Sequence, residues 1–287
     1  PWKEKLPQTA YCRATMGAGV PLVDVVLSVR GLTLRFAGVL AVWDVSFSLH
    51  AGELLGIIGP NGAGKTSVLN CINGFYRPQA GRISFLGRDI THLPPHTRAH
   101  LGISRTFQNI ALYPHMTVLQ NILSGRLAHM HSSLLSCGVY WGFAQREVLQ
   151  HRKRVEEIID FLEIEPYRDQ RVAELPYGIQ KKVELGRALA MEPRLLLLDE
   201  PMAGMTVDEK ADMARYILEL REVHGLPMIL IEHDMGVVMD LCDRILAMDY
   251  GRKIAEGPPE EIQNHPDVIR AYLGEEHGVA EEVAGGA

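Results

Sequence analysis

The sequence of 287 residues lacks a membrane-crossing apolar run, closely paired cysteines and a dense cluster of basic residues. No apolar run approaches the roughly 20 residues that a membrane-crossing helix needs. The four cysteines have no C-x-x-C spacing and no accompanying histidine pattern, so reduced thiols in a cytosolic protein are the simplest interpretation. The formal net charge is -6 and no dense Lys/Arg run occurs, which argues against a nucleic-acid partner.

What the sequence does contain is an apolar fraction of 47%, enough for a large domain with an additional lobe, and a glycine-rich octapeptide. The octapeptide matches every fixed position of the pattern G-x-x-x-x-G-K-[S/T]. It consists of Gly59, Pro60, Asn61, Gly62, Ala63, Gly64, Lys65 and Thr66. A short apolar run, 53–58, predicts a buried strand before it, and 67–73 predicts a helix after it that ends at Gly74.

A loop between a strand and a helix is the setting in which this pattern binds phosphate. Its glycines let backbone N–H groups surround phosphate oxygens, and the helix N-terminus adds the positive end of its dipole. We expect Lys65 to reach the β- and γ-phosphates and the Thr66 hydroxyl to bind Mg²⁺, and we include Ser67 in the nucleotide site. The expected ligand is ATP.

Two acidic residues follow a run of four leucines in residues 194–200. The run predicts a buried parallel strand, and ligands of open α/β sheets bind at the carboxyl ends of such strands. Asp199 then suits Mg²⁺, held through water, and Glu200 suits the general base that activates the attacking water. Alone this pair is a weak signal, but the upstream phosphate loop makes it a strong one.

Two further residues lie where predicted strands end. His233 follows the buried strand 228–231, where a γ-phosphate contact competes with the commoner structural role of a lone histidine. Gln108 follows the predicted strand 103–107, and a glutamine at that position is usually a solvated loop residue.

Phe36 lies between two runs of alternating polarity, 27–35 and 45–49, that predict an antiparallel β element. Its ring could stack on adenine or pack in the core, and the spacing alone does not decide between them.

Residues 109–174 have a helical pattern and predict an inserted helical lobe. Within it, Leu127–Gln145 carries no formal charge and predicts either a locally packed hairpin or a docking face for a membrane subunit. Capping boxes at Thr117 and Thr206 predict helix starts, and another helix opens at Leu175–Gln180.

Taken together, these motifs resemble the ATP-binding subunits of ABC transporters over residues 27–274. In that comparison Lys65 lies in the Walker A loop, Gln108 resembles the Q-loop, Leu175–Gln180 the family signature, Asp199-Glu200 Walker B, and His233 the switch histidine. The resemblance implies an α/β fold, with a P-loop NTPase (RecA-like) core, an antiparallel β subdomain and an inserted α-helical subdomain. It also favours adenine stacking for Phe36 and adds Gln108 to Thr66 and Asp199 as Mg²⁺ ligands.

The resemblance also implies a domain organisation. The ABC ATPase domain would span 27–274, with the helical subdomain at about 109–174 and a C-terminal family tail at about 254–274. An extension at 1–26, for which disorder is one interpretation, would precede the domain, and a flexible tail at 275–287 would follow it.

A narrower resemblance points to the importers of branched-chain amino acids. It rests on Phe36–Val42, Arg105–Gln108, Ile254–Ile262 and Ala271–Gly274, and on Tyr177 in the signature. Importers of urea and short-chain amides share much of this pattern, so they are the alternative.

The signature departs from the usual family pattern at two positions. Pro176 replaces a serine and can offer neither a hydroxyl nor an N–H, and Ile179 replaces Gln or Glu. Nucleotide contacts would then come from Tyr177, Gly178 and Gln180 at the start of the following helix.

The resemblance implies a pair of ATPase subunits, identical or paralogous, that sandwich two nucleotides on the cytoplasmic face of the membrane. The partners would be transmembrane permease subunits and, indirectly, an external solute-binding protein. Two other classes are a soluble ABC ATPase of translation or DNA repair, and a binding module whose catalysis has lapsed. The single cassette argues against the first, and intact Lys65, Asp199, Glu200 and His233 argue against the second.

Overall fold

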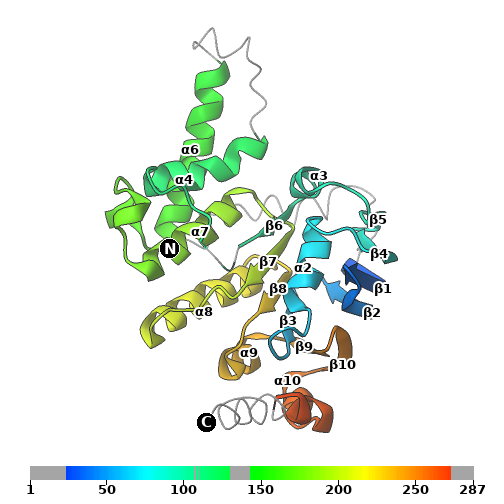
Figure 1. The fold of residues 1–287 in the computed structure, drawn as a ribbon. Helices are drawn as coiled ribbons and strands as arrows, with labels where there is room; N and C mark the ends of the chain where they lie inside the picture. The colour runs from blue at the N-terminus through cyan, green and yellow to red at the C-terminus, as the bar shows by residue number, and fades with distance from the viewer. Residues whose placement is uncertain (1–23, 107, 109, 130–142, 273–287) are drawn as a thin grey trace.

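The computed structural model describes residues 24–106, 108, 110–129 and 143–272. The expected tail at 275–287, nearly all of the expected extension at 1–26 and most of the uncharged stretch Leu127–Gln145 lie outside these residues. Two sheets and a group of helices make up the described chain (Figure 1).

The smaller sheet is antiparallel and confirms the predicted β element. Its order is β2-β1-β4-β5, with β1 at Val25–Phe36, β2 at Val39–His50, β4 at Ala80–Phe85 and β5 at Arg88–Asp89. Leu27 and Val29 of β1 are both buried, because alternate side chains of a strand lie on the same face of the sheet.

The larger sheet has six strands, and adjacent strands run parallel to each other except β10 and β9, which are antiparallel. Its order is β10 (Arg252–Gly257), β9 (Arg244–Asp249), β3 (Leu54–Ile58), β8 (Met228–Ile231), β7 (Leu195–Asp199) and β6 (Ile103–Arg105). In β7, Leu196 and Leu198 pack into one core and Leu195 and Leu197 into the other. The leucine run is therefore explained by burial on both faces.

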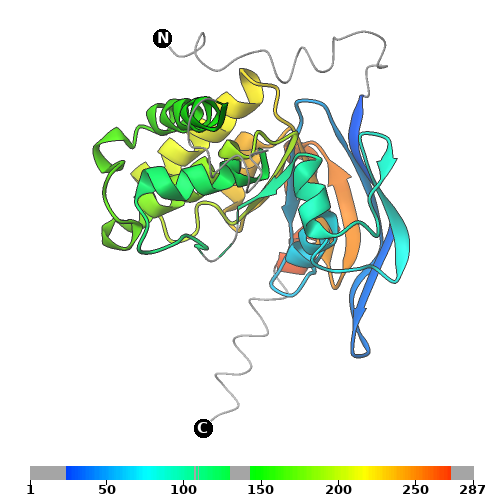
Figure 2. The ribbon, with the colours of Figure 1, turned by 90° about the horizontal axis from the view of Figure 1, so that it is seen from above.

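The helices cover the two faces unequally, as Figure 2 shows from above. One helix, α2 (Lys65–Asn73), packs in the core between the two sheets. On the other face lie α4 (Val118–Ser124), α6 (Phe143–Phe161), α7 (Tyr177–Ala190), α8 (Val207–Glu222) and α9 (Met235–Leu241). The shorter elements include α3 (Pro95–His100), α10 (Pro259–Gln263), η2 (Gly125–His129), η3 (Glu165–Tyr167) and η4 (Val172–Glu174), and residues 266–272 are also helical.

The predicted helix starts are confirmed, whereas one predicted strand end was too late. Both capping boxes form, with the Thr117 and Thr206 hydroxyls accepting from backbone N–H groups three residues on. Strand β6 ends at Arg105 rather than residue 107. Because α7 packs against α4 and α6, the helical layer extends beyond residue 174. No described helix has both the length and the apolar character to cross a membrane.

A fully buried arginine fixes the C-terminal end of α2. The Arg98 guanidinium donates hydrogen bonds to the carbonyls of Cys71 at 2.5 Å, Ile72 at 2.8 Å, Thr91 at 3.0 Å and Leu93 at 2.9 Å. Two of these carbonyls belong to the last turn of the helix, where the regular intrahelical hydrogen bonds end and the Gly74 N–H, at 3.3 Å from the Cys71 carbonyl, adds a backbone donor. Burial lowers the pKa of Arg98, so the four carbonyls stabilise a cation held away from water.

We therefore expect Arg98→Met to reduce the free energy of unfolding by about 2–4 kcal/mol, because it leaves buried carbonyls without donors. Urea unfolding followed by circular dichroism measures the change. The matched control is Arg88→Met, which removes an exposed arginine from β5 and should have little effect. Equal midpoints for the two variants would contradict this role of Arg98.

Candidate functional site

The predicted phosphate loop connects β3 to α2 in a conformation that requires glycine. Gly59, Gly62 and Gly64 have φ angles of 147°, 77° and 94°, which side-chain-bearing residues rarely adopt. A Cβ atom at Gly59 would collide with the carbonyl oxygen of Met248, and one at Gly64 would collide with that of Ala41. The backbone of the loop is thus held tightly against the neighbouring strands.

The Lys65 side chain bends back over the loop. Its Nζ donates to the carbonyl oxygens of Gly59 at 2.6 Å and Pro60 at 2.9 Å, and the residue is only 6% exposed. The buried ammonium is therefore compensated by the loop itself, at the edge of the cleft where phosphates would lie.

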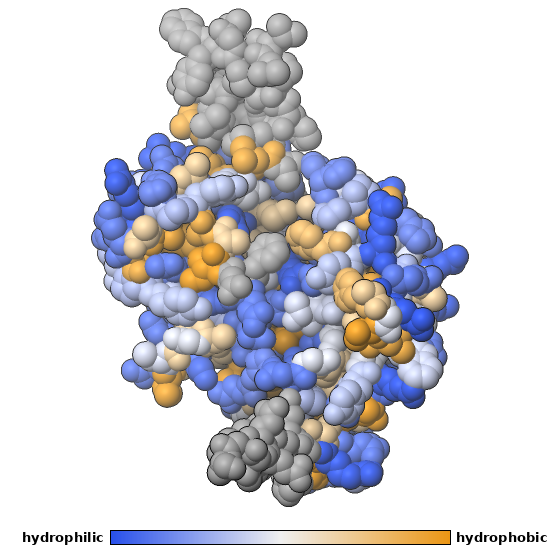
Figure 3. All heavy atoms as spheres, viewed as in Figure 1, coloured by the Kyte–Doolittle hydropathy of each residue, from blue (hydrophilic) through white to orange (hydrophobic). Residues whose placement is uncertain are grey.

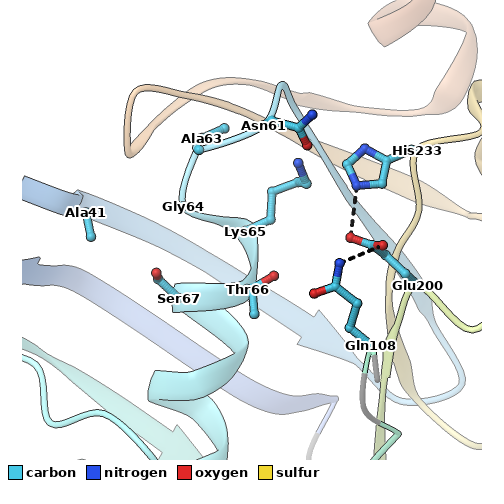
Figure 4. A pocket seen from close by; sticks show the side chains of 11 residues that line it. Ala41, Asn61, Ala63, Gly64, Lys65, Thr66, Ser67, Gln108, Glu200 and His233 are labelled. Atoms are coloured by element: carbon cyan, nitrogen blue, oxygen red, sulfur yellow. Dashed lines mark hydrogen bonds and ion pairs between the residues drawn. The ribbon is translucent and has the colours of Figure 1, made fainter. Parts of the chain in front are cut away.

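The loop forms one wall of an open cleft, shown in Figure 4. Residues from widely separated parts of the sequence line it: Ala41, Asn61, Gly62, Ala63, Gly64, Lys65, Thr66, Ser67, Gln108, Glu200 and His233. The structure thus brings the predicted phosphate loop, the predicted base and the two strand-end residues into one site.

Glu200 lies immediately beyond β7 with both carboxylate oxygens engaged (Figure 4). Its Oε2 accepts from Gln108 Nε2 at 3.0 Å, and its Oε1 lies 2.9 Å from His233 Nε2. The Glu200 N–H donates to Ile231 at 2.9 Å, and the residue has the left-handed φ of 50°. This unusual backbone turns the nearly buried carboxylate, 8% exposed, toward the cleft.

Asp199, the last residue of β7, is fully buried and paired with a cation. Arg105 Nη2 donates to its Oδ2 at 2.6 Å, and Arg105 Nη1 donates to Asn70 Oδ1 on α2 at 2.5 Å. The Asp199 Oδ1 atom is buried but accepts no hydrogen bond from any described residue. A buried carboxylate oxygen with spare acceptor capacity fits the predicted water-linked Mg²⁺ position.

Six predicted nucleotide-binding residues are not among those that line the cleft, and neither is the predicted metal ligand Asp199. Two of the six, Gly59 and Pro60, begin the phosphate loop and accept from Lys65 through their carbonyls. Phe36 ends β1, is 41% exposed, and places its ring edge-on to Tyr76 at 4.8 Å between centroids. Tyr177, Gly178 and Gln180 lie at the start of α7. Gln180 Nε2 donates to the carbonyl of Leu175, two residues before α7 begins, at 2.9 Å.

Four residues that support the site were not assigned to it from the sequence. Arg105 donates to Asp199 and is itself held by Asn70, whose side-chain oxygen accepts from it. Lys181 Nζ donates to the Gln108 carbonyl at 3.2 Å, and the Tyr272 hydroxyl accepts from the Gly59 N–H at 2.9 Å. Only Arg105 had a local signal, since it ends a short strand whose neighbour carries two acids. The others depend on contacts across many residues.

A glycine-rich loop at the head of a helix, beside a buried acidic strand end in a mainly parallel sheet, defines a P-loop nucleoside triphosphatase. The sequence profile of the ABC transporter family matches residues 42–203, and that of the branched-chain amino acid ATP-binding cassette transporters matches residues 252–278. The chain therefore belongs to the ATP-binding cassettes of the ABC transporter family.

Individual relatives agree with this assignment. The chain is 39% identical over 254 residues to a high-affinity branched-chain amino acid transport ATP-binding protein of Pseudomonas aeruginosa, and 42% identical over 253 residues to one of Escherichia coli. Each alignment covers 87% of this chain and 98% of the relative.

Solved structures give the same result. A nucleotide-free ATP-binding cassette from an ABC transporter matches with a TM-score of 0.75 and 34% identity, covering 86% of this chain and 98% of its own. An ABC transporter cassette in its ADP conformation matches with a TM-score of 0.76 and 33% identity, covering 87% of this chain and 99% of its own. The predicted fold class and family are confirmed.

The buried pair of Arg105 and Asp199 leads to a prediction about stability. Arg105→Met leaves a buried carboxylate without its cation, so the free energy of unfolding should fall by about 3–5 kcal/mol. Adding Asp199→Asn removes the isolated charge and should restore part of that loss. Urea unfolding of the two single variants and the double variant measures the coupling, and strictly additive effects would contradict the pairing.

Proposed function

We propose that this chain binds and hydrolyses ATP to drive an importer of branched-chain amino acids. The observation that carries the proposal is the cleft itself, in which the phosphate loop faces Glu200, Gln108 and His233. A fold alone would support many activities, whereas this set of side chains is suited to phosphoryl transfer to water.

The phosphate loop is proposed to hold the triphosphate. The backbone N–H groups of Gly62–Thr66 and the N-terminus of α2 would bind its oxygens, together with Ser67. The ammonium of Lys65 would exchange its two loop carbonyls for the β- and γ-phosphates. Phe36 is proposed to stack on adenine, for which its partly exposed ring offers a surface.

Magnesium fits the residues beside the loop. The Thr66 hydroxyl and the Gln108 side-chain oxygen would bind the ion directly, and Asp199 would hold it through water. When bound, the ion supplies positive charge that offsets the negative charge of the phosphates.

Hydrolysis is proposed to depend on Glu200 as the general base. A carboxylate oxygen of Glu200 would accept a proton from the attacking water, while Gln108 and His233 hold that carboxylate in place from two sides. In the loaded site the partly exposed His233 would also contact the γ-phosphate. Both contacts restrict the Glu200 rotamer, which is the positioning that a base requires.

Family membership supports the predicted partners. We propose that two ATPase subunits, identical or paralogous, face each other so that Tyr177, Gly178 and Gln180 of each complete the site of the other. Transmembrane permease subunits would dock on the helical layer, with an external solute-binding protein acting indirectly, and the ATPase would lie on the cytoplasmic membrane face. Exposed apolar side chains that include Tyr113 and Leu127 support this docking surface. In Figure 3 hydrophobic and hydrophilic residues are mixed on the left of the view, where Figure 1 places the helical layer.

The predicted role of Glu200 is tested by Glu200→Gln, which keeps the size of the side chain but removes the base and leaves one acceptor oxygen in place of two. We expect ATP affinity within about twofold of wild type and turnover at least 100-fold lower, in line with the usual contribution of general-base catalysis. Equilibrium binding of a fluorescent ATP analogue measures the affinity. Phosphate release by the chain assembled with its permease subunits measures the turnover.

Two controls sharpen this test. The exposed Glu222→Gln makes the same chemical change on α8 and should leave turnover unaltered. Lys65→Ala should instead lose nucleotide affinity, because the charged phosphate contact is gone. Wild-type turnover by Glu200→Gln would refute the assignment of the base.

The transported solute is tested on the complex purified from native membranes through this chain and reconstituted in vesicles with its binding protein. We expect ATP-dependent uptake of radiolabelled leucine, isoleucine or valine that is lost with Glu200→Gln. Uptake of urea or a short-chain amide in their place would favour the alternative importer classes. Recovery of the active ATPase without any permease would contradict a transport role.

A further inference from the structure

The C-terminal segment of the chain reaches the phosphate loop directly. Residues 266–272 are helical and follow α10, within the part matched by the branched-chain cassette profile. The hydroxyl of Tyr272, the last residue that the structure describes, accepts a hydrogen bond from the backbone N–H of Gly59, with an N–O distance of 2.9 Å across 213 sequence positions. Gly59 is the first residue of the phosphate loop.

Gly59 is a sensitive point at which to hold the loop. Its N–H donates to Tyr272, and its carbonyl accepts from Lys65 Nζ at 2.6 Å. Its φ of 147° and the Met248 carbonyl, with which a Cβ atom would collide, mean that no residue with a side chain fits at this position. The orientation of one glycine therefore links the C-terminal hydroxyl to the lysine that is proposed to bind phosphate.

The same segment also packs beside the residues that follow His233. Helix α9 begins at Met235, and its Met235 and Met239 line an apolar groove with Val268, Ile269 and Tyr272. The Tyr272 ring is partly buried against the main hydrophobic core. The segment thus contacts both the loop that holds phosphate and the helix that begins two residues after the predicted γ-phosphate contact.

We propose that Tyr272 is a positioning residue of the nucleotide site, through which the C-terminal segment sets the conformation of the phosphate loop. The proposal rests on the proposed ATP-binding function. The hydroxyl satisfies the Gly59 N–H, which lies in the Ile58–Gly59 peptide group, and so restrains the φ angle of Gly59. The Gly59 carbonyl that accepts from Lys65 lies in the next peptide group, so its direction depends on that angle. Without the hydroxyl the Ile58–Gly59 peptide group is less restrained, and part of the ATP binding free energy is spent on reordering the loop.

The test uses Tyr272→Phe in the full chain, which removes the hydroxyl and keeps the ring. The pair Ile58-Gly59 is the only Ile–Gly step in the sequence, so labelling isoleucine carbonyls with carbon-13 and glycine nitrogens with nitrogen-15 gives one assignable amide signal. Loss of the acceptor should shift this signal and increase its hydrogen exchange rate. The matched control is Tyr167→Phe, which removes a hydroxyl from η3 in the helical layer.

The functional arm compares ATP affinity and steady-state kinetics. Loss of one net hydrogen bond predicts roughly three- to tenfold weaker ATP binding, and KM should rise by the same factor while kcat stays within about twofold. The thermal midpoint verifies that the variant is folded.

Each outcome has a distinct meaning. An unchanged Gly59 signal together with wild-type affinity in folded Tyr272→Phe would overturn the positioning role, as would equal effects of Tyr167→Phe. Failure of the wild-type chain to bind ATP would instead contradict the proposed function. Altered signal and affinity in Tyr272→Phe alone would support the inference.

Discussion

The parallel register of three buried strands is the constraint on which the site depends. Asp199 of β7 pairs with Ile231 of β8, and Ile57 of β3 pairs with the same Ile231 from the other side. Because these strands end at a common level, the residues that follow them emerge at one edge of the sheet. Glu200, His233 and the phosphate loop therefore meet without any long connection between them.

This constraint explains how much the sequence could predict. Leucines on successive positions require burial on both faces, which fixed β7 as a central strand and Glu200 as an edge residue. The Gly59–Thr66 pattern was equally local. The Tyr272 contact was not predictable, because it joins Gly59 to a residue 213 positions away through packing that no periodicity encodes. The bond from Gln108 to Glu200 likewise needed the tertiary structure.

The backbone at Glu200 illustrates how the site maintains an unfavourable local geometry. A left-handed residue other than glycine costs on the order of 1 kcal/mol or more, and such strain persists only where its surroundings over-determine it. Here three contacts do so: the N–H to Ile231, the Gln108 amide and the His233 ring. Two of these contacts come from Gln108 and His233, which are proposed to lie next to the bound nucleotide. The same side chains that would take part in catalysis therefore stabilise the strained backbone at Glu200.

The predicted signature region is connected to the same carboxylate even though it lies outside the cleft of its own subunit. Gln108 donates from its side chain to Glu200 and accepts at its carbonyl from Lys181, a buried residue of α7. A displacement of α7 that kept the Lys181 bond would carry the Gln108 backbone with it and change the contact to Glu200. If Tyr177 and Gly178 at the start of α7 contact the nucleotide held by a second subunit, that contact acts on a helix already linked to Glu200 of its own subunit. The path from α7 to Glu200 then runs through one residue, Gln108, and would couple the two sites of the pair without a longer pathway through the core.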